Sequence, residues 1–137
     1  MEDIVIERVI DAPRERVWKA LIDPEDLKHW SHADEGWTTP FAETDPRVGG
    51  TLRIGFGSPD GKNDFVLEGT YTVVEEPDRL VYKMGDDRIV TNTLVEEGGK
   101  TKITISFTPE EENTREKQQE GWSLILKHLV EYLEGEK

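Results

Sequence analysis

The sequence contains no cysteine, and this excludes disulfides, thiolate nucleophiles and thiolate metal sites. It also contains no apolar run that approaches the roughly 20 residues needed to span a bilayer. The opening residues, MEDIVIERVI, have neither the basic start nor the long apolar stretch of a signal peptide. From these absences we expect a soluble, cytosolic (cytoplasmic) protein with no membrane partner.

Basic residues are scarce beside acidic ones. The 17 lysines and arginines face 30 aspartates and glutamates, which leaves a formal net charge of −13. Duplex nucleic acid carries one negative charge about every 1.7 Å and would repel a protein of this charge. We therefore expect no nucleic-acid partner. The same acidic surface favours a monomer, or at most a weak dimer.

Apolar residues make up only 34% of the 137 positions, and charged residues make up another 34%. A chain of this length forms one ordinary domain and buries roughly two-thirds of its unfolded surface. We expect a single domain over residues 1–137, with an economical core and few apolar side chains left for an exposed patch.

The N-terminal part predicts one strand followed by two short helices. Residues 4–10 are rich in β-branched side chains, which predicts a strand. Pro13 then suits the first turn of a helix, and Asp23 with Pro24 repeats this start signal. The second helix is expected from about Pro24 to Trp30.

The central part predicts an antiparallel meander. Residues 31–50 suggest an irregular strand that is closed by a Gly49-Gly50 turn. From residue 51 to residue 108, alternating segments separated by turn signals predict successive strands, about six in all with the irregular one. One predicted strand face consists of Phe65, Leu67, Tyr71 and Val73.

A long amphipathic helix ends the chain. Asn113, with Glu116 three positions later, predicts its N-terminal cap. Its apolar face, through to Gly135, carries Trp122, Ile125, Leu126, Leu129 and Leu133. Twenty-odd residues give a length of about 30 Å, enough to cross several strands. The whole order indicates an α+β fold in which a curved antiparallel sheet wraps around the C-terminal helix, with an internal cavity between them.

Five short motifs in register resemble the START-like (SRPBCC, Bet v 1-like) superfamily, and more narrowly the relatives of the C-terminal domain of the Hsp90 ATPase activator Aha1. They are the segment from Ala12 to Trp18, Asp23-Pro24-Glu25 with Trp30, the D-x-R-V-G-G pattern from Asp45 to Gly50, Gly69-Thr70-Tyr71 with Thr101-Lys102-Ile103-Thr104, and Gly121-Trp122. In the third motif, Pro46 stands where the group is expected to have an apolar residue.

The resemblance implies a helix-grip fold whose cavity holds lipid-, polyketide- or flavonoid-like molecules in various members. Some relatives are cyclases, some bind or sequester ligands, and the eukaryotic namesake stimulates a chaperone ATPase. Because one fold hosts many functions, the resemblance does not by itself decide among these.

Motifs for metal, nucleotide or nucleophilic chemistry find better structural explanations. His29, His32 and Asp34 form H-x-x-H-x-D, but His128 is far off in sequence and a zinc site needs three or four ligands. We expect these histidines at the surface or at the cavity mouth, with no metal and no cofactor. The glycine-rich segment 55–62 fails the phosphate-loop spacing and predicts a hairpin turn.

The serines and the carboxylates also favour structural roles over catalytic ones. None of the four serines lies in a G-x-S-x-G elbow, so we assign no catalytic residue. Strand parity places Glu68 opposite Leu67 and Tyr71, which predicts an outward side chain. Asp45 and Arg47 are expected to form an ion pair that pins the following turn.

Aromatic residues are the strongest functional signal, because they offer large apolar contact together with a polar handle. The predicted ligand-binding residues are Trp30, Trp37, Tyr71, Tyr82, Trp122 and Leu126. The alternative for each of them is a place in the packed core.

Three functions remain open from the sequence. The first is binding of a small hydrophobic molecule between the sheet and the long helix, without catalysis. The second is an enzyme of cyclase or hydratase type with an acid/base group in the cavity. The third, and least favoured, is a co-chaperone that activates the Hsp90 ATPase, because the namesake domain acts within a larger protein.

Overall fold

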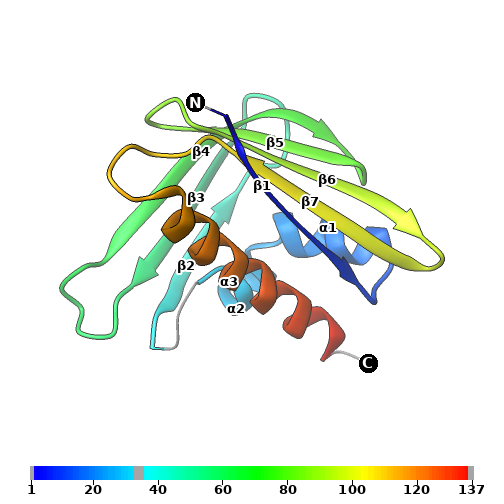
Figure 1. The fold of residues 1–137 in the computed structure, drawn as a ribbon, viewed down its shortest axis with the longest axis horizontal. Coiled ribbons are helices and arrows are strands. Elements are labelled where there is room, and N and C mark those ends of the chain that lie inside the picture. Colours follow the sequence, from blue (N-terminus) through cyan, green and yellow to red (C-terminus); the bar gives the residue numbers. More distant parts are fainter. Residues whose placement is uncertain (1, 33–35, 136–137) are drawn as a thin grey trace.

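The computed structural model describes residues 2–32 and 36–135, which form seven strands and three helices (Figure 1). In chain order the elements are β1 (Ile4–Ile10), α1 (Arg14–Ile22), α2 (Pro24–Trp30), β2 (Thr38–Thr44), β3 (Thr51–Gly57), β4 (Phe65–Glu75), β5 (Arg79–Met84), β6 (Ile89–Glu97), β7 (Lys100–Phe107) and α3 (Arg115–Glu134). The predicted order of one strand, two helices, six strands and a long helix is confirmed.

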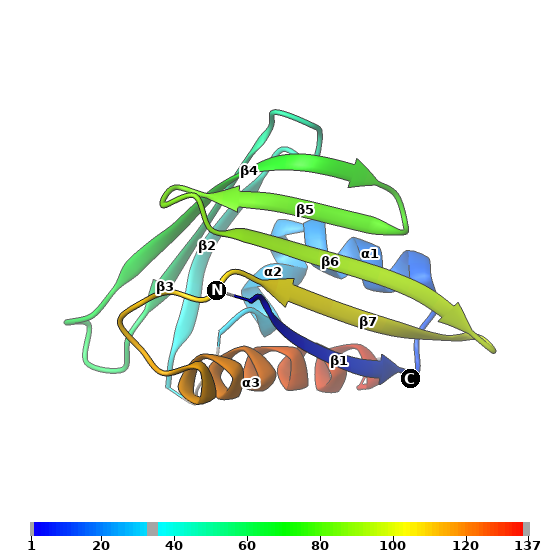
Figure 2. The same cartoon turned by 45° about the horizontal axis from the view of Figure 1, so that its top comes forward.

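All seven strands belong to one antiparallel sheet in the order β1-β7-β6-β5-β4-β3-β2. The sheet curls into a half-barrel, and the three helices lie on its concave side (Figures 1 and 2). Helix α3 packs along β1 and against α2, whereas α2 packs on β2. The predicted α+β arrangement of a curved sheet around a C-terminal helix is therefore confirmed.

The start of α2 follows the local signal in the sequence. The Asp23 carboxylate accepts a hydrogen bond from the backbone N–H of Glu25, and Pro24 occupies the first helical position. Both features stabilise a helix start, because the first N–H groups of a helix have no partner within it.

One buried carboxylate ties the three helices together. Asp26 of α2 receives two hydrogen bonds from the Arg16 guanidinium of α1, at 2.9 and 3.1 Å, and one from the Tyr132 hydroxyl of α3, at 2.5 Å. Lys19 of α1 adds a fourth contact at 3.2 Å. Burial opposes the charge, but these hydrogen bonds outweigh it and lower the pKa of Asp26 to about 2.

Helix α3 begins one residue later than predicted. Its cap is Thr114, whose hydroxyl accepts a hydrogen bond from the Lys117 N–H, so the prediction of Asn113 as the cap is wrong. The physical reason is that the first helical hydrogen bond runs from the Gln118 N–H to the Thr114 carbonyl, which puts Thr114 at the cap position.

A second correction concerns β4. The pairing with β5 shifts between Tyr71 and Val73, which is the mark of a β-bulge. An extra residue reverses the parity, so it is Val74, opposite the buried Leu80, that packs on the core face with Tyr71. The prediction of Val73 on that face is wrong for this reason.

Candidate functional site

The inner face of the sheet is not fully sealed at β4 and β5. Leu67 lies opposite the buried Ile54 of β3, and Tyr82 lies between the buried Leu80 and Met84 of its own strand, yet both Leu67 and Tyr82 keep solvent-accessible surface. The inner face of a central strand is ordinarily covered by the core. The core therefore does not completely cover the concave side at these two positions, and we call this incompletely covered part the recess.

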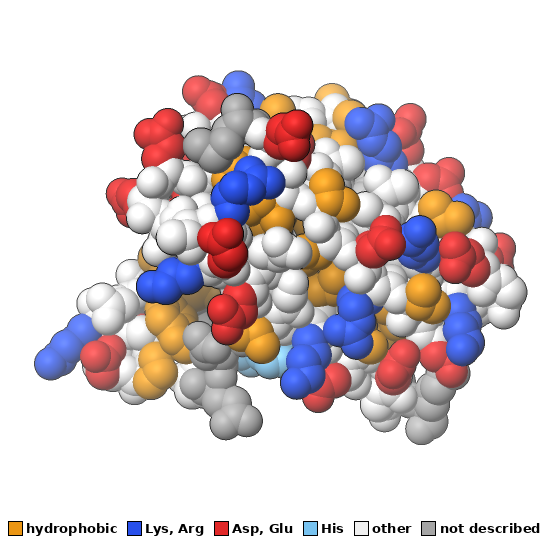
Figure 3. All heavy atoms as spheres, viewed as in Figure 1, with side chains coloured by type: hydrophobic (Ala, Val, Ile, Leu, Met, Phe, Trp, Pro, Cys, Tyr) orange, Lys and Arg blue, Asp and Glu red, His pale blue; other side chains and the backbone are white. Residues whose placement is uncertain are grey.

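An aromatic cluster stands at one end of this recess. Phe65, at the start of β4, is 53% exposed although it lies on the inner face opposite Phe56. Its ring centroid is 5.0 Å from that of Phe56 and 6.0 Å from that of Trp37. Figure 3 shows hydrophobic side chains at the lower left, beside the projecting β3–β4 hairpin. An exposed aromatic group next to partly buried ones suits contact with an apolar molecule.

Strand pairing leads from this recess across the sheet to α3. Tyr71, Tyr82, Val90 and Phe107 are successive cross-strand partners on β4, β5, β6 and β7. Three steps at about 4.8 Å give a row about 14 Å long. Trp122 of α3 stacks on the last ring, with centroids 4.4 Å apart and ring planes 17° apart. Val90 and Phe107 are buried, so this row is packed core that connects the partly exposed Tyr82 to the partly exposed Trp122. We call the inner-face set Trp37, Phe65, Leu67, Tyr71, Tyr82 and Trp122 the concave groove.

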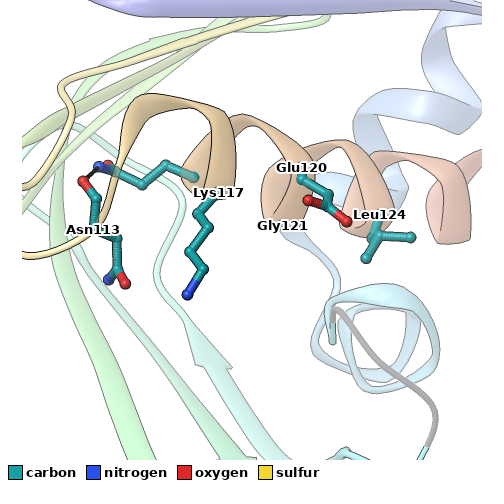
Figure 4. Close-up of a pocket in the computed structure, with 6 residues that line it drawn as sticks. Asn113, Lys117, Glu120, Gly121 and Leu124 are labelled. Atoms are coloured by element: carbon teal, nitrogen blue, oxygen red, sulfur yellow. Dashed lines mark hydrogen bonds between the residues drawn. The ribbon is translucent and has the colours of Figure 1, made fainter.

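A separate hollow lies along the first half of helix α3. A hollow of about 380 Å³ is lined by Asn113, Lys117, Gln118, Glu120, Gly121 and Leu124 (Figure 4). A Cβ atom added at Gly121 would meet nothing within 4 Å, so the absence of a side chain there leaves the hollow open.

Tyr71 closes the groove at its inner end and lacks a hydrogen-bond partner. The side chain is 1% exposed, its ring lies 6.4 Å from that of Tyr82 at 85°, and its hydroxyl has no partner among the described residues. Burial raises the pKa of Tyr71, and the Asp45 carboxylate raises it further. Burial and the neighbouring Tyr71 likewise raise the pKa of Tyr82. Both phenols therefore stay protonated at neutral pH.

The six predicted ligand-binding residues fall into two groups. Trp37, Tyr71, Tyr82 and Trp122 line the concave groove. Trp30 is 7% exposed and donates its indole N–H to the Ala20 carbonyl at 2.9 Å, so it joins α2 to α1. Leu126 is 1% exposed within the core. Ligand contact by any of the six stays a prediction.

Two groove residues were not among those six. Alternation along the strand predicted Phe65 and Leu67 on the face that carries Tyr71, but neither was predicted as a ligand-binding residue. The alternation in β4 was the available signal, but alternation predicts the face of a side chain and not its exposure.

The histidines form a contact that the sequence did not indicate. The His32 and His128 rings lie 5.4 Å apart, and the His128 Nδ1–H donates to the His32 carbonyl at 2.5 Å. His29 stacks on Tyr132, and Asp34 lies outside the described residues. Among those described, no three His, Cys, Asp or Glu side chains could together hold a metal ion. The contact joins the segment after α2 to α3.

This histidine contact predicts a pH dependence of stability. Burial lowers the pKa of His32, and the neighbouring His128 lowers it further. As the pH falls, the unfolded chain takes up a proton at this histidine near pH 6.5, whereas the folded chain does so only at a lower pH. The contribution of His32 to stability is therefore complete above pH 6.5 and is lost as the pH falls through the folded pKa. We expect the melting temperature to fall between pH 7.5 and pH 5, and to fall less in His32→Gln. Parallel curves for the two proteins would contradict this assignment.

The remaining sequence motifs take structural roles. Arg47 Nε lies 2.8 Å from Asp45 Oδ2, so the predicted ion pair is confirmed. Glu68 is exposed on the convex face, as predicted, with its carboxylate 3.9 Å from Arg53 Nε. A second hollow, of about 550 Å³, lies on this convex face and includes Arg53, Glu68 and Lys83. None of these three side chains points to the concave groove, because they alternate with the inward residues of their strands.

A half-barrel sheet closed by a long C-terminal helix defines the helix-grip, or Bet v 1-like, class of α+β proteins. Within this class the chain belongs to the family described as Activator of Hsp90 ATPase homolog 1-like protein, whose model matches residues 11–134. Comparison with the curated proteins yields no match.

Solved structures agree with this membership. The AHSA1-like protein from Aeromonas hydrophila is 35% identical, with a TM-score of 0.91 over 97% of this chain and 92% of that chain. A protein from Cytophaga hutchinsonii is 36% identical, with a TM-score of 0.85 over 98% of this chain and 93% of that chain. A third, from Chromobacterium violaceum, is 27% identical, with a TM-score of 0.84 over 98% and 99%. Along the described residues, no helix has the length and apolar character required to traverse a bilayer.

Proposed function

We propose that this protein binds a small hydrophobic molecule in the concave groove. The observation that carries the proposal is the partial exposure of Leu67 and Tyr82 on the inner face of central strands. Apolar surface left open in a concavity is the usual setting of a small-molecule site. Proteins of this fold commonly bind hydrophobic ligands, which supports the same conclusion.

Binding suits the groove better than catalysis does. On the inner face of β3 to β7, all of which the structure describes, Glu96 stands at the exposed end of β6 opposite Thr101, and the titratable groups of the groove are Tyr71 and Tyr82. Their pKa values are raised, whereas a general acid or base works best with a pKa near the operating pH. Glu68, the strand carboxylate considered from the sequence, lies on the opposite face. The cyclase or hydratase alternative thus gains no support from the strand side of the groove, and no contact among the described residues favours a chaperone partner.

The proposal is tested by fluorescence titration with N-phenyl-1-naphthylamine, a neutral aromatic probe that brightens in apolar surroundings. We expect a saturable signal with the unaltered protein. Phe65→Ser should weaken the affinity about tenfold, because it removes roughly 1.5 kcal/mol of apolar contact at the mouth of the groove.

Val66→Ser is the matched control. Val66 is the next residue along β4, is also exposed, and points to the convex face. Its replacement should leave the probe affinity unchanged. Absence of saturable binding, or equal losses in the two variants, would overturn the proposal. Melting temperatures of both variants establish that they remain folded.

A further inference from the structure

The inner end of the concave groove presents a hydrogen-bond donor without a partner. Three buried side-chain atoms lack partners among the described residues: Arg14 Nε, Trp18 Nε1 and the Tyr71 hydroxyl. The first two belong to α1, whereas Tyr71 belongs to the groove. An unmade hydrogen bond at a buried polar group is unfavourable, and native proteins avoid it. A molecule that brings an acceptor to the Tyr71 hydroxyl would remove this penalty.

The charge that acts on that hydroxyl is negative, because the Asp45 carboxylate raises the pKa of Tyr71, and the Arg47 guanidinium beside Asp45 is already paired with it at 2.8 Å. On β3 to β7, which are described throughout, the inward positions hold apolar side chains together with the neutral Asn92, Thr101, Tyr71 and Tyr82, and the charged Glu96 stands away from them at the exposed end of β6, opposite Thr101. A carboxylate or sulfonate in this place would lose its hydration without gaining an ion pair. The net charge of −13 disfavours the approach of an anion as well.

We infer that the ligand is an uncharged, flat, apolar molecule bearing one carbonyl or similar oxygen, and that this oxygen accepts a hydrogen bond from the Tyr71 hydroxyl. The inference rests on the proposed function and adds the chemical class of the ligand. Tyr82, which contacts Tyr71 edge to face, supplies the aromatic wall beside the oxygen. Tyr71 is thereby a specificity-determining residue of the site.

The experiment compares 9-fluorenone with fluorene, two flat tricyclic molecules that differ by one carbonyl oxygen. Each is titrated as a competitor of N-phenyl-1-naphthylamine against the unaltered protein and against Tyr71→Phe. We expect the variant to bind fluorenone about fivefold to tenfold more weakly and to bind fluorene within about twofold of the unaltered protein. Equal changes for the two competitors would overturn the assignment to Tyr71.

Stability gives an independent readout of the same residue. If the hydroxyl lacks a partner in the ligand-free protein, Tyr71→Phe should melt at the same temperature or higher. A lower melting temperature would mean that the hydroxyl is already satisfied within the protein, and would overturn the inference.

The requirement for an uncharged ligand has its own matched pair. 8-Anilinonaphthalene-1-sulfonate is the same ring system as N-phenyl-1-naphthylamine with a sulfonate added, and we expect it to bind at least about tenfold more weakly. Equal or tighter binding would overturn this part of the inference. If the neutral probe itself does not bind, the proposed function fails; if it binds and the fluorenone comparison fails, only the inference does.

Discussion

Replacing Asp26 with alanine is expected to lower the free energy of unfolding by about 2–4 kcal/mol, since its removal leaves the half-buried Arg16 guanidinium and the Tyr132 hydroxyl without their common acceptor. The carboxylate is 5% exposed and is the common acceptor for Arg16 and Lys19 of α1 and Tyr132 of α3. Arg16 also lies over the Tyr132 ring, 5.8 Å from its centroid. One substitution therefore loosens three helices at once.

Urea denaturation at pH 7 measures this loss, and Glu25→Ala is its matched control. Glu25 precedes Asp26 on the same helix, but its ion pair with Lys28 is exposed. Exposed pairs contribute about 0–1 kcal/mol. If the two variants lose similar amounts, the contacts of Asp26 do not hold the helices together.

The free energy of unfolding at acidic pH offers a second test of the role of Asp26. The pKa of Asp26 is lowered to about 2 in the folded protein. A lowered pKa means that the ionised carboxylate is more stable in the folded protein than in the unfolded chain. Asp26 therefore contributes to stability above about pH 4, and this contribution is lost as the pH falls towards 2. Asp26→Ala should accordingly be less sensitive to pH in this window than the unaltered protein.

Local sequence signals were enough for most of the fold. Helix α2 runs from Pro24 to Trp30 as predicted, because its cap and its proline act within one turn. The prediction of Asn113 as the cap of α3 was wrong, because Asn and Thr both suit a cap and the adjacent Thr114 accepts the first helical hydrogen bond. The bulge after Tyr71 was also missed, since an alternating pattern does not reveal an inserted residue.

The site was predictable only where strand alternation defined it. Tyr71 and Tyr82 were chosen from the sequence, and strand pairing makes them direct partners. Tyr71 is 1% exposed whereas Tyr82 is partly exposed, and alternation along the strands does not predict this difference. The contact between His128 and His32 joins residues 96 positions apart, which no local pattern encodes, and was missed as well.

The turn before β3 should tolerate an added methyl group poorly, and this turn also positions the inner end of the groove. A Cβ atom at Gly50 would lie 1.9 Å from the carbonyl oxygen of Asp45 and 3.0 Å from that of Arg47. Backbone atoms cannot rotate away as a flexible side chain can. We therefore expect Gly50→Ala to lower the free energy of unfolding by about 2–4 kcal/mol.

The displacement caused by Gly50→Ala should reach Tyr71 through two backbone hydrogen bonds. The Tyr71 N–H donates to the Gly50 carbonyl at 2.9 Å, and the Gly49 N–H donates to the Tyr71 carbonyl at 2.8 Å. Gly49 has a φ of +88°, which favours glycine, so the two glycines are required for different reasons. A shifted turn should weaken fluorenone binding as well as stability, because it displaces the donor at the inner end of the groove.

Gly121→Ala is the matched control for this prediction. It is also a glycine-to-alanine change, but it lies within α3, where the added Cβ meets nothing within 4 Å. Alanine is the better helix former, so we expect a gain of about 0.5–1 kcal/mol. Thermal and urea denaturation of the two variants should therefore shift in opposite directions. If the Gly50→Ala protein is as stable as the unaltered one, the turn accommodates the methyl group while its hydrogen bonds to β4 stay intact. The glycine pair would then not be required to position Tyr71.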